Sequence, residues 1–275
     1  MSNIIQQANM KVILSRKGFD SANGGIPSPI LPDGTLLSLP IPSELDREIK
    51  FSDIYYGEKS YYDIIKELKP QSHINGSSYC HLDPDLRKDI KIRPVSWIPA
   101  YGQTGAALSE LYNNKIGIGD LFLFFGWFKQ TELSNGKLQF RKGTPNLHII
   151  YGYLQVGSII SSLDKIPVGL EQHPHAKQER WNKNNAIFLP TNHLSILKNL
   201  PGASHLKYSN KLVLTKNNCS RSRWNLPDFF RDIYITHHNS KSWKEDYFQS
   251  AAIGQEFIFE TNNLVVNWIK SILNQ

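Results

Sequence analysis

One carboxylate stands beside a loop that is rich in glycine. Asp20 follows the apolar run 11–15, with Ser21 and Asn23 next to it and Gly24-Gly25 just beyond. A carboxylate placed there could activate a water molecule or stabilise a developing positive charge, and glycines let the backbone approach a ligand closely. The plainer alternative is that Asp20 caps a turn through the neighbouring backbone. Chemistry alone favours the turn-capping role.

A second group of polar residues alternates along the chain. His81, Asp83 and Asp85 occupy every other position of the segment His-Leu-Asp-Pro-Asp. In an extended chain these side chains could bind a divalent cation or act as acid and base, which makes His81 and Asp83 catalytic candidates. The alternative, which we favour, is a helix start with Asp83 as the N-cap, Pro84 as the first helical residue and Asp85 near the positive helix end. His81 remains a candidate pocket residue in either case.

Two histidines flank a proline at His173-Pro174-His175. Such a pair could bind zinc, but no thiolate and no third histidine lies at a familiar spacing from it. We therefore expect no metal site here. Contacts with phosphate or sugar, or a place on a loop, suit His173 and His175 better.

Two further segments combine aromatic side chains with polar ones. Trp181 could stack on a base while Asn182 and Asn185 read a base edge, although a tryptophan packed in the core is at least as plausible. Arg221 and Arg223 could make bidentate contacts with phosphate beside the ring of Trp224. The alternative for this second segment is a surface turn whose tryptophan anchors it to the core.

The charge balance favours a polyanionic partner. The 275 residues include 31 Lys and Arg against 24 Asp and Glu, which gives a formal net charge of +7. Basic residues concentrate at 16–17, 216–223 and 241–244, so nucleic acid is the simplest partner, although solubility alone could explain the excess. No phosphate-binding GxxxxGK[ST] loop, dinucleotide fingerprint or GxSxG elbow is present, which argues against nucleotide triphosphate hydrolysis, nicotinamide chemistry and serine hydrolysis.

The same sequence indicates where the protein works. It has no apolar run of about 18 residues that could span a bilayer and no pattern of a secretory signal. Two cysteines, Cys80 and Cys219, cannot form a disulfide framework. We expect a cytoplasmic protein without membrane contact.

Periodic patterns predict the elements that must position these residues. Short apolar runs predict strands at 11–15, 35–42, 121–128, 147–156, 186–189, 211–215 and 233–236, and Asn135-Gly136 predicts a hairpin turn. Helical spacing predicts helices at 61–68, 106–112, 242–248 and 264–273. Gly126 and Gly152 indicate bulges or sharp bends. The fold class is therefore α+β, a single domain over 10–275 with a curled, mostly antiparallel, barrel-like sheet and surrounding helices, preceded by a dispensable leader at 1–9.

Several segments resemble the third nucleotide-modification-associated domain family. The specific part is the N-terminal block KVILSRKGFDS followed by Gly24-Gly25, PSPILPDG and LPIP. Weaker pieces are GDLFLFFG at 119–126, His173-Pro174-His175 with Trp181 and Asn185, and GQEF at 254–257. The resemblance covers nearly the whole chain after Met10. It implies a role with modified DNA bases, and a related group resembles phage-defence DNA glycosylases.

That resemblance leads to a hypothesis about the function of the residues named above. It implies a DNA glycosylase that acts on a modified base, such as glucosylated hydroxymethylcytosine, in foreign or phage DNA. The reaction is a hydrolysis that needs only water besides the DNA, so no cofactor is expected. Asp20 would stabilise the sugar cation or activate water. Arg16 and Lys17 would hold phosphates or pair with Asp20. The alternatives are a non-catalytic reader of modified DNA and a metal-dependent nuclease that uses Asp20, or Asp83 with Asp85.

Overall fold

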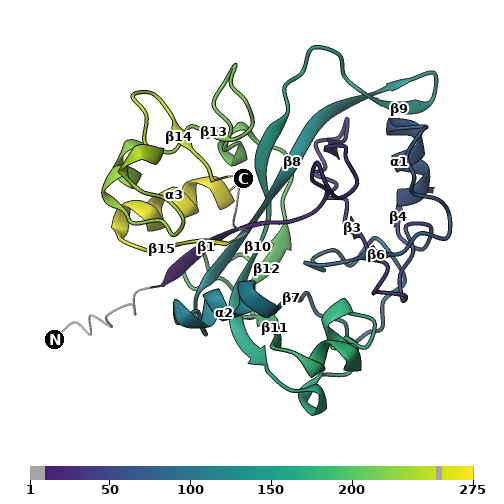
Figure 1. The fold of residues 1–275 in the computed structure, drawn as a ribbon, viewed down its shortest axis with the longest axis horizontal. Helices are drawn as coiled ribbons and strands as arrows, with labels where there is room; N and C mark the ends of the chain where they lie inside the picture. The colour runs from purple at the N-terminus through teal and green to yellow at the C-terminus, as the bar shows by residue number, and fades with distance from the viewer. Residues whose placement is uncertain (1–9, 252–255, 275) are drawn as a thin grey trace.

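The computed structural model describes residues 10–251 and 256–274, so the expected leader at 1–9 lies outside the described residues. Over this range the fold is α+β: one large mixed sheet curls into a half-barrel, with helices and long loops around it (Figure 1).

The α-helices are α1 (Tyr61–Leu68), α2 (Gly105–Asn113) and α3 (Asn263–Leu273). The strands are β1 (Lys11–Arg16), β2 (Ser28–Ile30), β3 (Ile41–Pro42), β4 (Tyr55–Tyr56), β5 (Lys59–Ser60), β6 (Cys80–His81), β7 (Tyr101–Thr104), β8 (Leu121–Ser134), β9 (Lys137–Phe140), β10 (Leu147–Ile160), β11 (Asn185–Pro190), β12 (Ala203–His205), β13 (Arg223–Trp224), β14 (Phe248–Gln249) and β15 (Glu256–Glu260). Short 3₁₀ helices are η1 (Leu163–Lys165), η2 (Pro174–Ala176), η3 (Gln178–Asn182), η4 (Asn210–Leu212), η5 (Asp228–Asp232) and η6 (Ser240–Ser242).

The two longest strands, β8 and β10, have 14 residues each and lie side by side in the middle of the sheet. The order is β15-β1-β8-β10-β11-β7, and β2 and β9 pair with later parts of β8 while β12 pairs with β10. Each long strand changes partners along its length, because a strongly twisted strand turns its edge away from one neighbour and toward another. The pairings of β1 and β2 with β8 are parallel and the other pairings in this sheet are antiparallel. The expected curled, mostly antiparallel sheet is confirmed.

Glycines relieve crowding where the sheet bends. The register of β8 against β10 shifts between Ile150 and Gly152, as the sequence predicted for a bulge at Gly152. At Gly126 the register continues, and the glycine serves another purpose. A Cβ there would lie 2.8 Å from the carbonyl oxygen of Lys17, so Gly126 lets the chain leave β1 close against β8.

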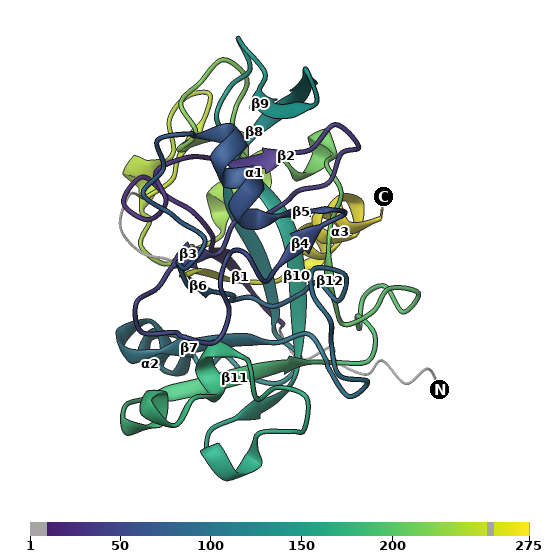
Figure 2. The same ribbon diagram turned by 90° about the vertical axis from the view of Figure 1, so that its right-hand side faces the viewer.

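Two groups of elements lie on opposite sides of the sheet in Figure 1, with α3, β13 and β14 on one side and α1, β3, β4 and β6 on the other. The α1 side has its own apolar cluster, to which Phe19, Phe51 and Tyr61 contribute. Ser60 caps α1 by accepting a hydrogen bond from the Asp63 backbone, and Figure 2 shows the helix beside β4 and β5. This second cluster supports the loop that follows β1 and the segment around His81.

Several predicted elements are wrong. No helix begins at Asp83, because its carboxylate accepts a hydrogen bond from the Gly102 backbone instead of capping its own segment. Residues 35–42 form only β3 and isolated bridges, 211–215 form η4 and bridges, and 233–236 form no strand. The expected helix at 242–248 is replaced by a loop that ends in β14. Some residues of these stretches take backbone partners from distant segments, as when Thr236 donates to Ile258 and Leu214 donates to His148, and a local pattern does not encode such a choice.

No helix among residues 10–251 and 256–274 is long and apolar enough to cross a membrane.

Candidate active site

A cavity of about 410 Å³ lies where several distant segments meet. They include the turn from β1 through residue 23, the segment of β6, the strand β7, the loop with η2 and η3, and the loop before β13, together with one residue each of β8 and β10. The volume is in the range of pockets that hold small molecules and cofactors. Among the predicted site residues, the cavity lining includes Arg16, Lys17, Asp20, Asn23, His81, Asp83, His175 and Arg221.

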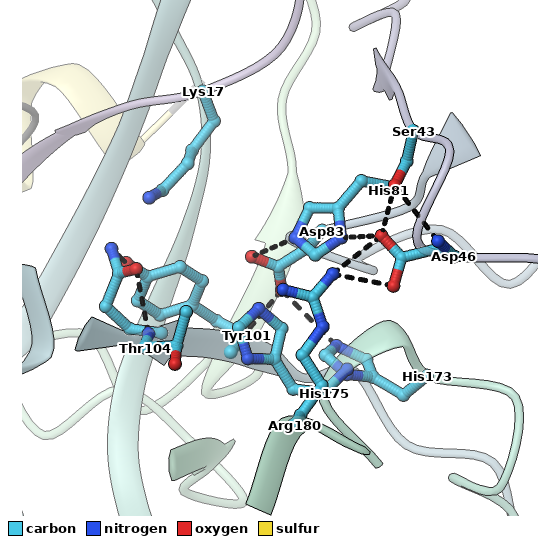
Figure 3. Close-up of polar contacts among 12 residues, drawn as sticks. Lys17, Ser43, Asp46, His81, Asp83, Tyr101, Thr104, His173, His175 and Arg180 are labelled. Carbon is cyan, nitrogen blue, oxygen red and sulfur yellow. Dashed lines mark hydrogen bonds and ion pairs between the residues drawn. The ribbon is translucent and has the colours of Figure 1, made fainter. Parts of the chain in front are cut away.

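The buried wall of the cavity carries Asp83 among three imidazoles (Figure 3). Asp83 Oδ1 accepts a hydrogen bond from the Gly102 backbone at 2.7 Å and lies 3.3 Å from His173 Nε2. Asp83 Oδ2 lies 3.9 Å from His81 Nε2. Side-chain ligand atoms of His81, Asp83 and His175 all lie within 4.8 Å of one another, and we call these three residues the histidine–aspartate cluster.

The protonation of this cluster follows from its burial and its contacts. Burial raises the pKa of Asp83, but the contact with His173 and the neighbouring imidazoles outweigh burial, so the pKa falls to about 2. Burial lowers the pKa of His175 to about 3, although Asp83 acts in the opposite direction. At neutral pH the cluster therefore presents an ionised carboxylate and a neutral His175 imidazole.

Two outer residues fix the orientation of the histidines. Asp46 Oδ2 lies 2.8 Å from His81 Nδ1, and Asp46 is also bound by Arg180 through two hydrogen bonds. Asn185 Oδ1 lies 2.7 Å from His175 Nδ1, while the Asn185 amide donates to the His175 carbonyl. Burial raises the pKa of Asp46, but its hydrogen bonds with His81, Arg180 and Ser43 hold the pKa well below its usual range. Asp46 is therefore an anionic acceptor for the His81 ring.

Asp20 occupies the turn after β1. Its Oδ1 accepts hydrogen bonds from the backbone of Ala22 at 2.8 Å and of Asn23 at 2.6 Å, and the Asn23 amide also reaches it. The turn-capping role is thus present in the structure. Asp20 and Asn23 nevertheless line the cavity, so the turn holds the carboxylate in place at its wall.

Cationic side chains crowd the same side of the cavity. Arg221 donates to the Ser21 hydroxyl at 2.8 Å, and its guanidinium lies 4.1 Å from the centre of the Trp127 ring. Burial lowers the pKa of Arg221, the charge of Arg16 lowers it further, and Asp20 opposes them. Such mutual repulsion among cations marks a region that favours an anion.

Other residues that the sequence predicted for the site lie outside the cavity or pair with other side chains of the protein. Lys17 pairs with buried Glu256 at 3.0 Å and not with Asp20, although it lines the cavity. Trp181 in η3 packs against the small apolar cluster that includes Leu170, and exposed Asn182 follows it. Neither residue is among those that line the cavity. Asp85 binds Arg93 through two hydrogen bonds and takes no part in the histidine–aspartate cluster.

The segment around Trp224 needs a correction. Trp224 is 1% exposed and packs in the main core, so its ring has no free face for a base and instead anchors the turn, which was the alternative interpretation. Arg223 is exposed, but it lies over the Tyr247 ring and not at the cavity.

Sequence reasoning missed several residues of the site. Asp46 and Arg180 orient His81, Trp127 and His148 line the cavity, and Glu256 lies behind Lys17. Glu256 is fully buried and its Oε1 accepts hydrogen bonds from Lys17, Tyr101 and Gln103. Only Glu256 had a signal, as part of the family-like GQEF segment.

Burial of His148 makes the stability of the native state sensitive to acid. Burial lowers the pKa of His148 to about 3, and the charges of Arg221 and Arg16 add to this. The native state therefore keeps the imidazole neutral, whereas the unfolded chain binds a proton below about pH 6.5. Native stability is lost as the pH falls from about 6.5 toward 3.

We expect His148→Asn, whose side-chain oxygen can still accept from the Trp224 ring nitrogen, to flatten this dependence. Between pH 7 and pH 4 the wild type should lose about 3 kcal/mol of unfolding free energy more than the variant. Urea unfolding of both proteins at each pH measures the difference. Equal losses in the two proteins would contradict the assignment.

The comparisons with known proteins identify the family of the chain. The family model described as nucleotide modification associated domain 3 matches residues 11–260. No curated protein and no solved structure shows significant similarity to the chain. The match spans β1 through β15 and includes every segment that lines the cavity. The chain therefore belongs to the nucleotide modification associated domain 3 family.

Proposed function

We propose that the protein is a DNA N-glycosylase that hydrolyses the bond between deoxyribose and a modified base in foreign DNA, such as phage DNA. The observation that carries this proposal is the pairing of carboxylates with crowded cations in one cavity. Asp20 lies with Arg16 and Arg221 on one side, and ionised Asp83 lies on the buried wall. Family membership supports a role with modified nucleotides.

Cleavage of an N-glycosidic bond passes through a cationic sugar. In our proposal Asp20 stabilises that cation, while His81 and Asp83 hold the water that attacks the anomeric carbon. The electron pair of the broken bond goes to the base nitrogen. The proton that the water loses passes through the cluster to the departing base, so the products are the free base and an abasic sugar.

The target base must leave the helix to reach such a cavity. Base-modifying enzymes flip the nucleotide out of the stack, and a volume of about 410 Å³ leaves room for a base that carries an added group. Arg16 and Arg221 then hold backbone phosphates beside the opening. Trp127, whose ring Arg221 covers on one side, provides an aromatic wall.

We also propose that residues 10–275 act as one catalytic domain in the cytoplasm, with residues 1–9 dispensable. The main sheet draws its strands from residues 11 to 260, which supports a single folding unit. Both cysteines are free thiols, as suits a reducing compartment.

The decisive assay compares plain DNA with hypermodified phage DNA. Purified protein is incubated with each, and released base is measured by mass spectrometry. Release from the modified DNA alone supports the proposal. Strand cleavage without free base would indicate a nuclease, and tight binding to modified DNA without any product would indicate a reader.

Binding to DNA should weaken steeply as salt rises. Each phosphate contact releases about one counterion, so the logarithm of affinity falls by about 0.9 per contact for each tenfold rise in salt. Arg221→Ala should reduce that slope by about one while weakening binding to all sequences. Fluorescence anisotropy between low and moderate salt measures both. Binding that does not change with salt would remove Arg16 and Arg221 from DNA recognition.

A further inference from the structure

The histidine–aspartate cluster combines ligand types that bind transition metals. Two imidazoles and one carboxylate are the protein ligands of many catalytic zinc sites and of non-haem iron sites, which keep positions open for water or substrate. His81 and Asp83 are alternate residues of one segment, and His175 comes from η2, about ninety positions later in the chain. Only the folded chain brings the three together.

Hydrogen bonds identify which ring nitrogens are available. Asp46 accepts two hydrogen bonds from Arg180, and its Oδ2 also lies 2.8 Å from His81 Nδ1, so this carboxylate oxygen accepts from His81 Nδ1 and His81 Nε2 keeps a lone pair. The Asn185 amide nitrogen donates to the His175 carbonyl, which leaves its oxygen to accept from His175 Nδ1. The Nε2 atom of each ring is then the free one. Metal-bound histidines are held in this way by a carboxylate or carbonyl on the other ring nitrogen.

His173 has a different place in the arrangement. Its Nδ1 accepts a hydrogen bond from the His175 backbone at 3.2 Å, so its Nε2 faces Asp83 Oδ1. The Gly102 backbone donates to that oxygen, with His173 Nε2 3.3 Å from it, which leaves Oδ2 toward His81. Asp83 can therefore offer one oxygen to an ion while the other is held in position.

All three residues of the cluster line the cavity, whereas His173 does not. Ligand atoms around a bound zinc or iron ion lie about 3 to 3.5 Å apart, given metal–ligand distances near 2.1 Å. The His81 to Asp83 separation of 3.9 Å reaches this range through small rotations of the side chains. An ion held by three groups on one wall would have its remaining positions toward the cavity.

We propose that His81, Asp83 and His175 bind one divalent transition-metal ion, with its open coordination positions facing the cavity. This inference corrects the expectation that the chain has no metal site. It does not depend on glycosylase activity. If both hold, the ion lowers the pKa of the attacking water, and the cluster activates that water through the metal.

The test uses untagged, full-length protein freed of metal by a chelator and titrated with Co²⁺, whose visible absorption reports its ligands. We expect one equivalent to bind, to be displaced by Zn²⁺, and to raise the melting temperature, because an ion that binds only the folded state stabilises it. Separate anaerobic titration with Fe²⁺, followed by nitric oxide and electron paramagnetic resonance, distinguishes an iron site from a zinc site.

Variants locate the ion. Asp83→Asn preserves the acceptor for the Gly102 backbone, and His175→Gln and His81→Gln preserve polarity, so circular dichroism should show folded proteins. Each should bind Co²⁺ at least 100-fold more weakly, and Asp46→Asn should weaken binding about 10- to 100-fold. The matched control is His73→Ala, which removes an exposed histidine outside the cluster and should leave binding unchanged.

Two results would overturn the proposal. One is a folded wild-type protein that binds less than a tenth of an equivalent. The other is wild-type affinity in all three cluster variants. If a glutamine variant does not fold, the Asp46→Asn titration decides, since it leaves the three ligands in place. Base release is not measured, so the metal site and the proposed function can fail separately.

Discussion

Asp20→Asn is expected to reduce single-turnover release of the modified base by about 100-fold or more. The substitution keeps the size of the side chain and removes its negative charge, which matters most when the sugar becomes cationic. The turn should survive, because the asparagine oxygen can accept the same bonds from the Ala22 and Asn23 backbone. DNA binding should persist or strengthen, since a carboxylate near phosphates is repulsive.

A second aspartate provides the matched control for this experiment. Asp33 also caps a turn, by accepting from the Thr35 backbone at 3.0 Å, but it does not line the cavity. Asp33→Asn should leave base release unchanged. Unfolding of the Asp20 variant would show that the carboxylate is needed only for the turn. Full activity in a folded Asp20 variant would remove Asp20 from the mechanism and leave His81 and Asp83 as the candidates.

Gly102→Ala should abolish base release and weaken Co²⁺ binding by at least tenfold. A Cβ at this position would lie 2.1 Å from Cγ of His175, closer than any real contact. The imidazole or β7 must therefore move, and overpacking of this kind costs about 1 to 3 kcal/mol of unfolding free energy. Displacement of His175 would separate it from Asp83 and Asn185.

Gly117→Ala is the control, because a Cβ there meets nothing within 4 Å. Thermal melts, base release and Co²⁺ titration of the two variants separate a loss of stability from a loss of the site. A Gly102→Ala protein that is as stable and as active as the wild type would show that His175 need not occupy the position described.

Local patterns were sufficient for the elements that begin and end on their own signals. The helical spacing at 61–68 and the stop before Pro70 correspond to α1. Asn135 and Gly136 both have positive φ in the turn between β8 and β9, as the dipeptide predicted. The family-like block beginning at Lys11 forms β1 and the Asp20 turn. The helix α1 and the β8–β9 turn meet their hydrogen-bonding needs close by, whereas β1 was predicted from its apolar residues and pairs with the distant strands β8 and β15.

The site was less predictable because the side chains that orient its residues come from distant parts of the sequence. The alternation of His81 and Asp83 was visible, but nothing local pairs them with His175 in place of His173. That choice follows from Asn185, which holds the His175 ring, and from Asp46 on the loop after β3. Similarly, the sequence around Arg221 and Trp224 left open whether the indole is buried or exposed, and it does not show that Arg221 lines the cavity whereas Arg223 does not.

The position of β1 has a consequence for how the protein is made. This first strand lies between β8 and β15, and its residue Lys11 pairs with Glu260 near the other end of the chain. During synthesis one edge of β1 must wait unpaired until residue 260 has left the ribosome, and such edges are sites of aggregation. Glu256, which holds Lys17 at the cavity, arrives with that same strand. A ribosome that stops before residue 256 thus releases a chain whose sheet is open and in which Lys17 lacks its carboxylate partner.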